Sequence, residues 1–282
     1  MLGKRLFLII VPIIFFAGCS PTTEIVQTRG IQIAPKNAEY IFKQGKNYHD
    51  KGKFKLARLR YQKAAHQRHA AAQNNLGLMY AEGKGVSQNF AQAIKWFRKA
   101  AAQGWVDAQY NIARMYHIGV PQNLSAAKHW YHKAAKQNDA EAQYRLGLMY
   151  YKGEGVTQNF TQAAKWFHKA SLQGHPEAQS GLGQLYYKGK GVKQYFKGAA
   201  YWTRKAAEQG LADAQNNLGM MYYKGEGVAK NWILSYQWVS LAAAQGEEEA
   251  IKGLKFLIKH LSVEQIIAGE RLAHEWTKKT KN

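Results

Sequence analysis

The sequence has 282 residues, of which 46% are hydrophobic, enough for one large folded body or an array of repeats. Its 40 Lys and Arg against 18 Asp and Glu give a formal charge of +22, which indicates either an anionic partner or a solvated basic surface. The single cysteine excludes a fold held together by intramolecular disulfides.

Residues 1–18 have the organisation of a secretory signal peptide. Lys4 and Arg5 precede an apolar run over residues 6–16, which is too short to span a bilayer, and small residues follow. The end of this segment, "FAGC", resembles the lipobox of bacterial lipoproteins, although Phe16 stands where that pattern usually has an aliphatic residue. The resemblance implies cleavage before Cys19 and lipidation of its side chain.

The residues after Cys19 predict an anchored protein with a flexible connection. In lipoproteins of this kind a serine at the next position, here Ser20, favours the outer membrane over the inner one. We therefore expect a location in the bacterial cell envelope, on the periplasmic side of the outer membrane. Residues 19–36 lack helical periodicity and predict a lipidated tether. Loss of residues 1–18 removes two basic residues and lowers the net charge from +22 to +20.

The rest of the chain is built from repeated helix pairs. Residues 37–69 resemble a tetratricopeptide repeat, and from residue 70 the pair Ala-Gln returns every 34 or 36 residues. Apolar residues at the i, i+3, i+4, i+7 spacing predict two antiparallel amphipathic helices in each unit. The units are 70–105, 106–139, 140–175, 176–211 and 212–247. Residues 248–282 predict two closing helices with a polar outer face, and Ser262 and Gln265 have the spacing of a capping box.

A glycine loop joins the two helices of most units. The string "KGEGV" at Lys152 is similar to a phosphate-binding loop, but the same or a closely similar string occurs in four of the five units. A pattern that recurs in each repeat indicates a turn, and no Gly-Lys-Ser/Thr follows it. The second unit has the shorter loop "YHIGVPQN", which we expect to alter the local geometry without breaking the helix pair. A further glycine after most second helices predicts a left-handed cap.

The string "AQNNLGLMYAEGKGVSQNFAQAIKWFRKAAAQG" is similar to the Sel1-like repeat, a relative of the tetratricopeptide repeat. The similarity extends over five copies. It implies an all-α fold, namely an α/α superhelical solenoid of stacked helix-turn-helix repeats with a concave groove. By analogy with tetratricopeptide arrays, the first helices would line this groove. Carried over from the small residue at Gly77 and its equivalents, the predicted lining is Asn74, Leu78, Tyr110, Arg114, Tyr144, Leu148, Tyr151, Gln184, Tyr187, Asn216, Met220 and Tyr223.

We find no set of residues that predicts catalysis, a metal site or a cofactor. Two histidine pairs, His66 with His69 and His129 with His132, have a spacing that could share a metal, but His132 occupies a repeat position that also accepts arginine. The acids before the Ala-Gln pairs fall in the first turn of a helix, where they favour the helix dipole. They are Asp107, Glu141, Glu177 and Asp213.

Three classes of function remain. The first is a non-enzymatic, lipid-anchored scaffold that binds a protein partner in the groove, where tyrosine and asparagine suit a peptide or a glycan. The family resemblance implies modulation of envelope enzymes or a role in host interaction. The second is a basic surface for an anionic envelope polymer or lipid, since secretion argues against nucleic acid. The third is a hydrolase of the β-lactamase type, but those relatives carry a disulfide in each repeat and this chain has none.

Overall fold

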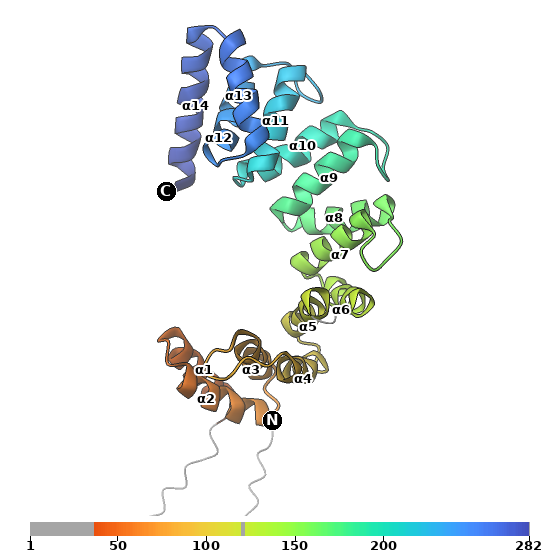
Figure 1. Cartoon of the computed structure of the whole chain (residues 1–282), viewed down its shortest axis with the longest axis vertical. Coiled ribbons are helices and arrows are strands. Elements are labelled where there is room, and N and C mark those ends of the chain that lie inside the picture. The colour runs from red at the N-terminus through yellow and green to blue at the C-terminus, as the bar shows by residue number, and fades with distance from the viewer. Residues whose placement is uncertain (1–36, 120–121, 282) are drawn as a thin grey trace, which may run out of the picture. The chain divides into compact units, whose positions relative to one another are not determined.

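A computed structural model describes residues 37–119 and 122–281, and these contain fourteen α-helices and no strand (Figure 1). The predicted signal peptide, Cys19 and the tether lie outside the described residues. The helices are α1 (Ala38–Asp50), α2 (Phe54–His66), α3 (Ala70–Glu82), α4 (Phe90–Ala101), α5 (Val106–Ile118), α6 (Leu124–Lys136), α7 (Ala140–Lys152), α8 (Phe160–Leu172), α9 (Pro176–Lys188), α10 (Phe196–Glu208), α11 (Ala212–Lys224), α12 (Trp232–Ala244), α13 (Glu248–His260) and α14 (Val263–Lys281).

The fold is a solenoid of stacked helix-turn-helix repeats, which confirms the predicted fold class. Odd-numbered helices from α1 to α11 are the first helices of their repeats, and α2 to α12 are the second helices. Each first helix packs on the second helix of its own repeat, and that second helix packs on the next first helix. In the described part of the chain, no extensive contact joins two first helices directly. The side of the array formed by the first helices is therefore free to hold grooves.

Local signals start and stop the helices. Asn89, Asn123, Asn159 and Asn231 each precede a second helix, and their side chains accept a hydrogen bond from a backbone N–H of the first turn at 2.9 Å. Most first helices end at a left-handed glycine; Gly153 has φ +79 and its N–H donates to the Met149 carbonyl. The glycine loops are thus turns, as predicted from their recurrence. Pro176 occupies the first turn of α9, where its missing N–H costs no helical hydrogen bond.

The core is a series of apolar layers between successive helices. Ala72, Leu76 and Gly77 on α3 are buried, as are the predicted positions of α4 from Ala93 to Ala101. Glycine is required inside α3 and α7, because a Cβ on Gly77 would lie 2.6 Å from the Phe97 ring and one on Gly147 would lie 2.6 Å from the Phe167 ring. The absence of a side chain here lets the two helices of a repeat approach closely.

The second repeat keeps its helix pair in spite of the short loop. Gly119, which follows α5, has φ −71, whereas the loops after α3, α7, α9 and α11 begin with a left-handed glycine. The loop still closes through a hydrogen bond from Asn123 N–H to the Tyr116 carbonyl at 2.9 Å, like that from Asn159 to Tyr150 at 2.9 Å in the next repeat. After α6, Asn138 replaces the usual glycine and takes φ +69. The repeat therefore loses loop residues without losing its closing contact.

A ladder of buried glutamines explains the second residue of the Ala-Gln pair. Gln143 is 1% exposed, and its Nε2 donates to the Ala135 carbonyl of the preceding second helix at 3.1 Å. Its Oε1 accepts from Nε2 of Gln173, 30 residues later, at 2.8 Å. The same glutamine pairing occurs in all five repeats: Gln103 to Gln73, Gln137 to Gln109, Gln173 to Gln143, Gln209 to Gln179 and Gln245 to Gln215. We name this set the glutamine ladder.

The C-terminal pair, α13 and α14, covers α12. The capping box is present, with Ser262 N–H donating to Gln265 Oε1 at 3.0 Å and Gln265 N–H donating to Ser262 Oγ at 3.3 Å. The expectation of a polar outer face is wrong, because large apolar side chains are exposed on both helices. These are Ile251, Phe256, Ile258, Val263 and Ile267. The two helices bury only a narrow apolar stripe against α12, so the remaining apolar positions face solvent.

Candidate interaction surface on the first helices

The first helices hold the predicted groove residues at three levels of exposure. Arg114 and Gln184 are exposed. Asn74 is only 5% exposed, and its Oδ1 accepts a hydrogen bond from Asn111 Nδ2 of the next repeat at 3.0 Å. Asn74 therefore joins two repeats and is not available to a partner, which corrects its predicted role. The remaining residues are half-buried: Leu78, Tyr110, Tyr144, Leu148, Tyr151, Tyr187, Asn216, Met220 and Tyr223.

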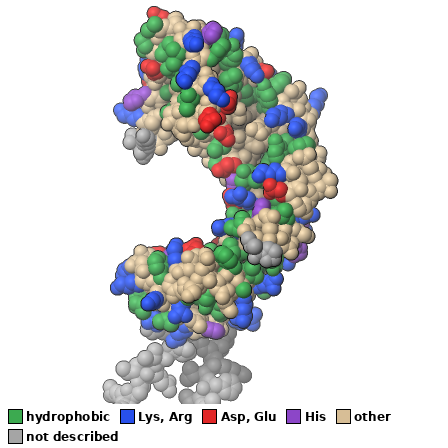
Figure 2. All heavy atoms as spheres, in the orientation of Figure 1, with side chains coloured by type: hydrophobic (Ala, Val, Ile, Leu, Met, Phe, Trp, Pro, Cys, Tyr) green, Lys and Arg blue, Asp and Glu red, His purple; other side chains and the backbone are tan. Residues whose placement is uncertain are grey.

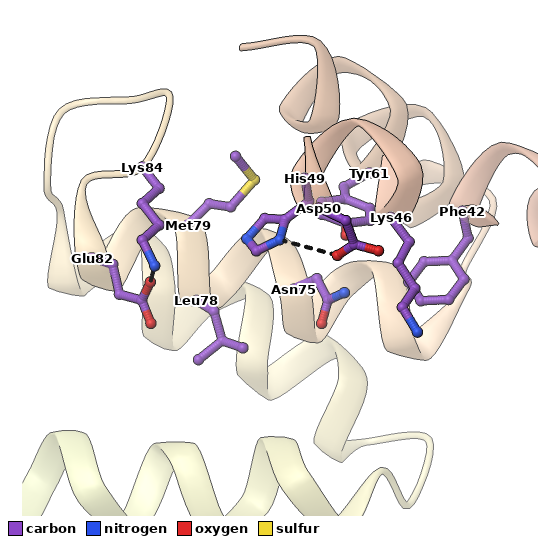
Figure 3. A pocket seen from close by; sticks show the side chains of 10 residues that line it. All are labelled: Phe42, Lys46, His49, Asp50, Tyr61, Asn75, Leu78, Met79, Glu82 and Lys84. Carbon is purple, nitrogen blue, oxygen red and sulfur yellow. Dashed lines mark ion pairs between the residues drawn. The ribbon is translucent and has the colours of Figure 1, made fainter. Parts of the chain in front are cut away.

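A cavity of about 340 Å³ opens between α1 and α3 (Figure 3). Leu78 and Met79 form an apolar wall, and the ion pairs of His49 with Asp50 and of Lys84 with Glu82 lie at its rim. The full lining is Phe42, Lys46, His49, Asp50, Tyr61, Asn75, Leu78, Met79, Glu82 and Lys84. Only Leu78 among these belongs to the predicted groove.

A second cavity, of about 270 Å³, lies between α9 and α11. Met220 and Met221 form its apolar wall, and Tyr187 reaches across it to accept from Lys224 Nζ at 3.4 Å and donate to Glu226 Oε2 at 2.6 Å. The hydrogen bond to Glu226 and then burial raise the pKa of Tyr187. The full lining is Gly183, Gln184, Tyr187, Lys188, Thr203, Asn217, Met220, Met221, Lys224 and Glu226. Here the predicted Gln184, Tyr187 and Met220 come together.

The two cavities occupy equivalent places in their repeats. Relative to the helical glycines Gly77 and Gly219, the pair Leu78 and Met79 corresponds to Met220 and Met221, and Asn75 corresponds to Asn217. The charges at the rim are exchanged, because Lys224 replaces Glu82 and Glu226 replaces Lys84. The solenoid thus presents two equivalent cavities in which the acid and the base at the rim have exchanged positions.

One side of this surface was not predicted from the sequence. Asn75, Asn217 and the residues at the ends of the first helices line the cavities but were not among the predicted groove residues. Helical periodicity contained the signal, because the positions two before and five after the helical glycine lie three and four residues from the chosen position that follows it, on one face of the helix.

A polar cluster joins α5, α7 and α9 in the middle of the array. Glu141 accepts from Arg145 Nε at 2.7 Å, from His175 Nε2 at 2.9 Å and from the Tyr110 hydroxyl at 3.3 Å. His175 Nδ1 accepts from the Ala178 N–H at 3.4 Å, so Nε2 carries the proton that is donated to Glu141. These contacts, with the His175 hydrogen bond foremost, lower the pKa of Glu141 to about 2. The acid predicted to serve only the helix dipole also links neighbouring repeats.

We expect Glu141→Gln to destabilise the protein in a pH-dependent way. A carboxyl whose folded pKa is lowered stabilises the fold above its ordinary pKa of 4.5, and this contribution fades as the pH falls toward about 2. The loss should be about 1 kcal/mol at neutral pH, because solvent screens a side chain that is 38% exposed. Urea unfolding between pH 7 and pH 3 measures it. Asp107→Asn, at the same repeat position and exposed, is the control, and an equal, pH-independent loss in both variants would contradict the assignment.

The other residues considered for a chemical role serve the structure instead, as far as the described residues show. Trp96, Trp166 and Trp238 are buried, as expected of core residues, and His132 packs edge-on against Trp166 at 5.8 Å. In residues 37–119 and 122–281 no group of three or more His, Cys, Asp or Glu is placed to hold a metal ion. Nor does any helix there have the length and apolar character needed to cross a membrane.

Comparisons with known proteins agree with this architecture. The family model of the Sel1 repeat matches residues 70–105, 106–139, 140–175, 176–211 and 212–247. A Sel1 repeat protein from Oxalobacter formigenes is 30% identical in a match covering 84% of this chain and 95% of that one, with a TM-score of 0.69. The protein c5321, a protective antigen of uropathogenic Escherichia coli with an SLR fold, is 28% identical over 86% of this chain and 62% of its own, with a TM-score of 0.56. No curated protein matches the sequence.

Proposed function

Because the chain belongs to the Sel1 repeat family, whose solenoids typically serve as protein–protein interaction scaffolds, we propose that it is a non-enzymatic, lipid-anchored scaffold of the bacterial envelope. It binds a protein partner along the first helices. The observation that carries the proposal is the pair of equivalent cavities on those helices, between α1 and α3 and between α9 and α11.

The cavities suit side chains of an extended peptide segment. Each has an apolar wall for a hydrophobic side chain, made by Leu78 and Met79 in one and by Met220 and Met221 in the other. Methionine adapts to ligands of different shape, which favours recognition of more than one sequence. Each rim also carries a lysine paired with a glutamate, Lys84 with Glu82 and Lys224 with Glu226, which can meet an acid or a base beside the bound side chain.

The envelope location is supported by the N-terminal sequence. The signal-peptide pattern and the lipobox-like "FAGC" favour Cys19 as the lipidated residue, and residues 19–36 would let the solenoid reach partners away from the membrane surface. Cys19→Ser should release the protein from the membrane fraction and abolish labelling by a palmitate analogue. If the variant stays in the membrane fraction and is still labelled, Cys19 is not the lipid anchor. The proposal for the interaction surface would not be affected.

We expect the double variant Tyr187→Ala/Met220→Ala to lose the partner. Both side chains line the cavity between α9 and α11, and truncating buried anchors at the centre of an interface typically weakens binding at least about tenfold. The measurement is crosslinking of the full chain in envelopes, followed by purification and quantification of the bound protein.

The matched control is Ile251→Ala/Ile258→Ala, which truncates two exposed apolar side chains on α13, outside the cavities. A protein enriched by the native chain and by the control, and lost from the cavity variant, supports the scaffold. Equal recovery with all three chains means that the first-helix surface is not the binding site. Turnover of a chromogenic β-lactam by the purified chain would favour the hydrolase instead.

A further inference from the structure

Charge is divided unequally between the two kinds of helix. The second helices α2, α4, α6 and α8 contain no Asp or Glu, and α10 contains only Glu208. Each of these helices carries at least two Lys or Arg. The acids of the repeats lie instead on first helices, in loops and at caps. On the face shown in Figure 2, Lys and Arg predominate over Asp and Glu.

The cations of the second helices have no acidic partners. Every Lys or Arg ion pair within residues 37–119 and 122–281 involves a first helix, a residue in the loop after one, or the C-terminal pair. By contrast, Lys99, Lys133, Lys169 and Lys205 are exposed and recur in the last turns of α4, α6, α8 and α10. We call the surface bearing these four lysines the cationic face.

Aromatic rings hold the lysines of the cationic face in place. Nζ of Lys99 lies 4.1 Å from the centroid of the Trp96 ring, and Nζ of Lys133 and Lys169 lie 4.6 and 4.8 Å from the rings of Trp130 and Trp166. Such cation–π contacts restrict the ammonium groups without neutralising them. The charges are therefore ordered in advance of binding, which reduces the entropy lost when an anion arrives.

The electrostatic potential at His132, a residue within the cationic face, is positive. Burial and the neighbouring Lys136, Lys128, His129 and Lys169 lower the pKa of His132, which lies on α6 among these lysines. Cations from both α6 and α8 contribute to this effect, so adjacent repeats add to one field. An anion would experience the opposite, attractive interaction.

Exposed apolar side chains lie beside the lysines. Leu172, at the end of α8, is 68% exposed and Tyr201 on α10 is 53% exposed. Both line a shallow cavity of about 420 Å³ together with Trp202 and Lys205. Leucine, tyrosine and tryptophan beside lysine are typical of surfaces that rest at the interface of a lipid bilayer, where rings and alkyl chains enter the headgroup layer and ammonium groups meet phosphates.

We infer that the cationic face binds a membrane surface of anionic phospholipid headgroups. Unpaired, ordered lysines supply the attraction to phosphate, and Leu172 and Tyr201 supply contacts that a soluble polyanion would not use. The inference goes beyond the proposed partner site, because the face is formed by different helices and leaves the cavities on the first helices open. A solenoid lying on its second helices would present its first helices to the aqueous side.

The test is binding of the purified full chain to vesicles of phosphatidylglycerol mixed with phosphatidylethanolamine, against vesicles of phosphatidylcholine alone. The variant Lys133→Gln/Lys169→Gln/Lys205→Gln is expected to lose affinity for the anionic vesicles on the order of a hundredfold. The matched control is Lys152→Gln/Lys188→Gln/Lys224→Gln, which removes the same charge from the last turns of α7, α9 and α11. Its affinity should stay within about threefold of the native chain, because screening confines the interaction to lysines near the bilayer.

The N-terminal segment is common to all three chains, so differences between them report the solenoid alone. Equal losses in the two variants would show an effect of net charge and overturn the assignment to this face, as would unchanged binding in both. Preference of the native chain for neutral vesicles would overturn it too. If soluble polyphosphate binds with the same dependence on the three lysines while anionic vesicles do not, the ligand is a polyanion in solution and the membrane inference is wrong.

Discussion

Gly191→Ala is expected to lower the free energy of unfolding by about 4 kcal/mol. Gly191 is the second glycine of the loop after α9 and has φ +70, which costs an L-residue about 1–2 kcal/mol. An added Cβ would also lie 2.5 Å from the Phe160 carbonyl oxygen, at the start of α8. The loop of one repeat rests here on the second helix of the repeat before it, so relief of the clash would separate two repeats. Urea unfolding followed by far-ultraviolet circular dichroism measures the loss.

Gly174→Ala is the matched control for this result. Gly174 has φ +87, but no atom lies within 4 Å of the position that an added methyl group would take, since the residue is at an open helix end. It should show only the conformational cost, about 1–2 kcal/mol. A loss in Gly191→Ala no greater than in Gly174→Ala would mean that the second loop glycine serves backbone conformation alone and not the contact between repeats.

Gln143→Met is expected to lower the free energy of unfolding by about 2 kcal/mol, although methionine matches glutamine in length and is the more apolar residue. The substitution removes the side-chain donor to the Ala135 carbonyl, which keeps only the Asn138 N–H at 3.2 Å, and it removes the acceptor of the Gln173 amide. A buried polar group that loses a partner retains part of its desolvation cost, about 1–3 kcal/mol, whereas the exposed Gln173 amide can turn to water. If the hydrogen bonds contributed nothing, methionine would stabilise the fold, because it is more hydrophobic than glutamine and the site is only 1% exposed.

A double-mutant cycle separates the contribution of the glutamine hydrogen bond from the contribution of packing. Gln173→Met removes the exposed member of the pair and should cost about 1 kcal/mol, and the double variant should cost less than the two single losses together. The difference estimates the coupling across the 2.8 Å hydrogen bond. If Gln143→Met is as stable as the native chain, the ladder contributes nothing and the recurrence of Gln in the Ala-Gln pair needs another cause.

Features within one helix pair could be predicted from the sequence. The helices, the glycine turns, the acids of the first turns and the capping box at Ser262 all depend on residues a few positions apart. Hydrogen bonds and side-chain contacts at this separation follow from helical periodicity and turn chemistry, whatever the rest of the chain does. Because the helix pair occurs five times in succession, the fold class could be predicted too: a single pair cannot bury its apolar stripe alone, but stacked pairs can.

The candidate sites were predicted only in part. Tyr187, Gln184 and Met220 were selected from the groove analogy and do meet in one cavity, whereas Asn74 is buried by its bond to Asn111. The sequence shows lysines that recur at one position of the repeat, Lys99, Lys133, Lys169 and Lys205, but their lack of acidic partners became evident only when ion pairs were assigned to particular helices.

The repeat, its two helices and the turns that join them therefore follow from the order of the residues, because they depend on neighbours along the chain. Packing in three dimensions sets what neighbouring repeats do to one another: the hydrogen bond from Asn111 to Asn74 across 37 residues, the one from the Tyr110 hydroxyl to Glu141 across 31, and the two cavities between alternate helices. These contacts depend on how far each repeat is shifted and rotated against the next. That offset is the sum of many small packing contacts between layers, and no local pattern in the sequence encodes it.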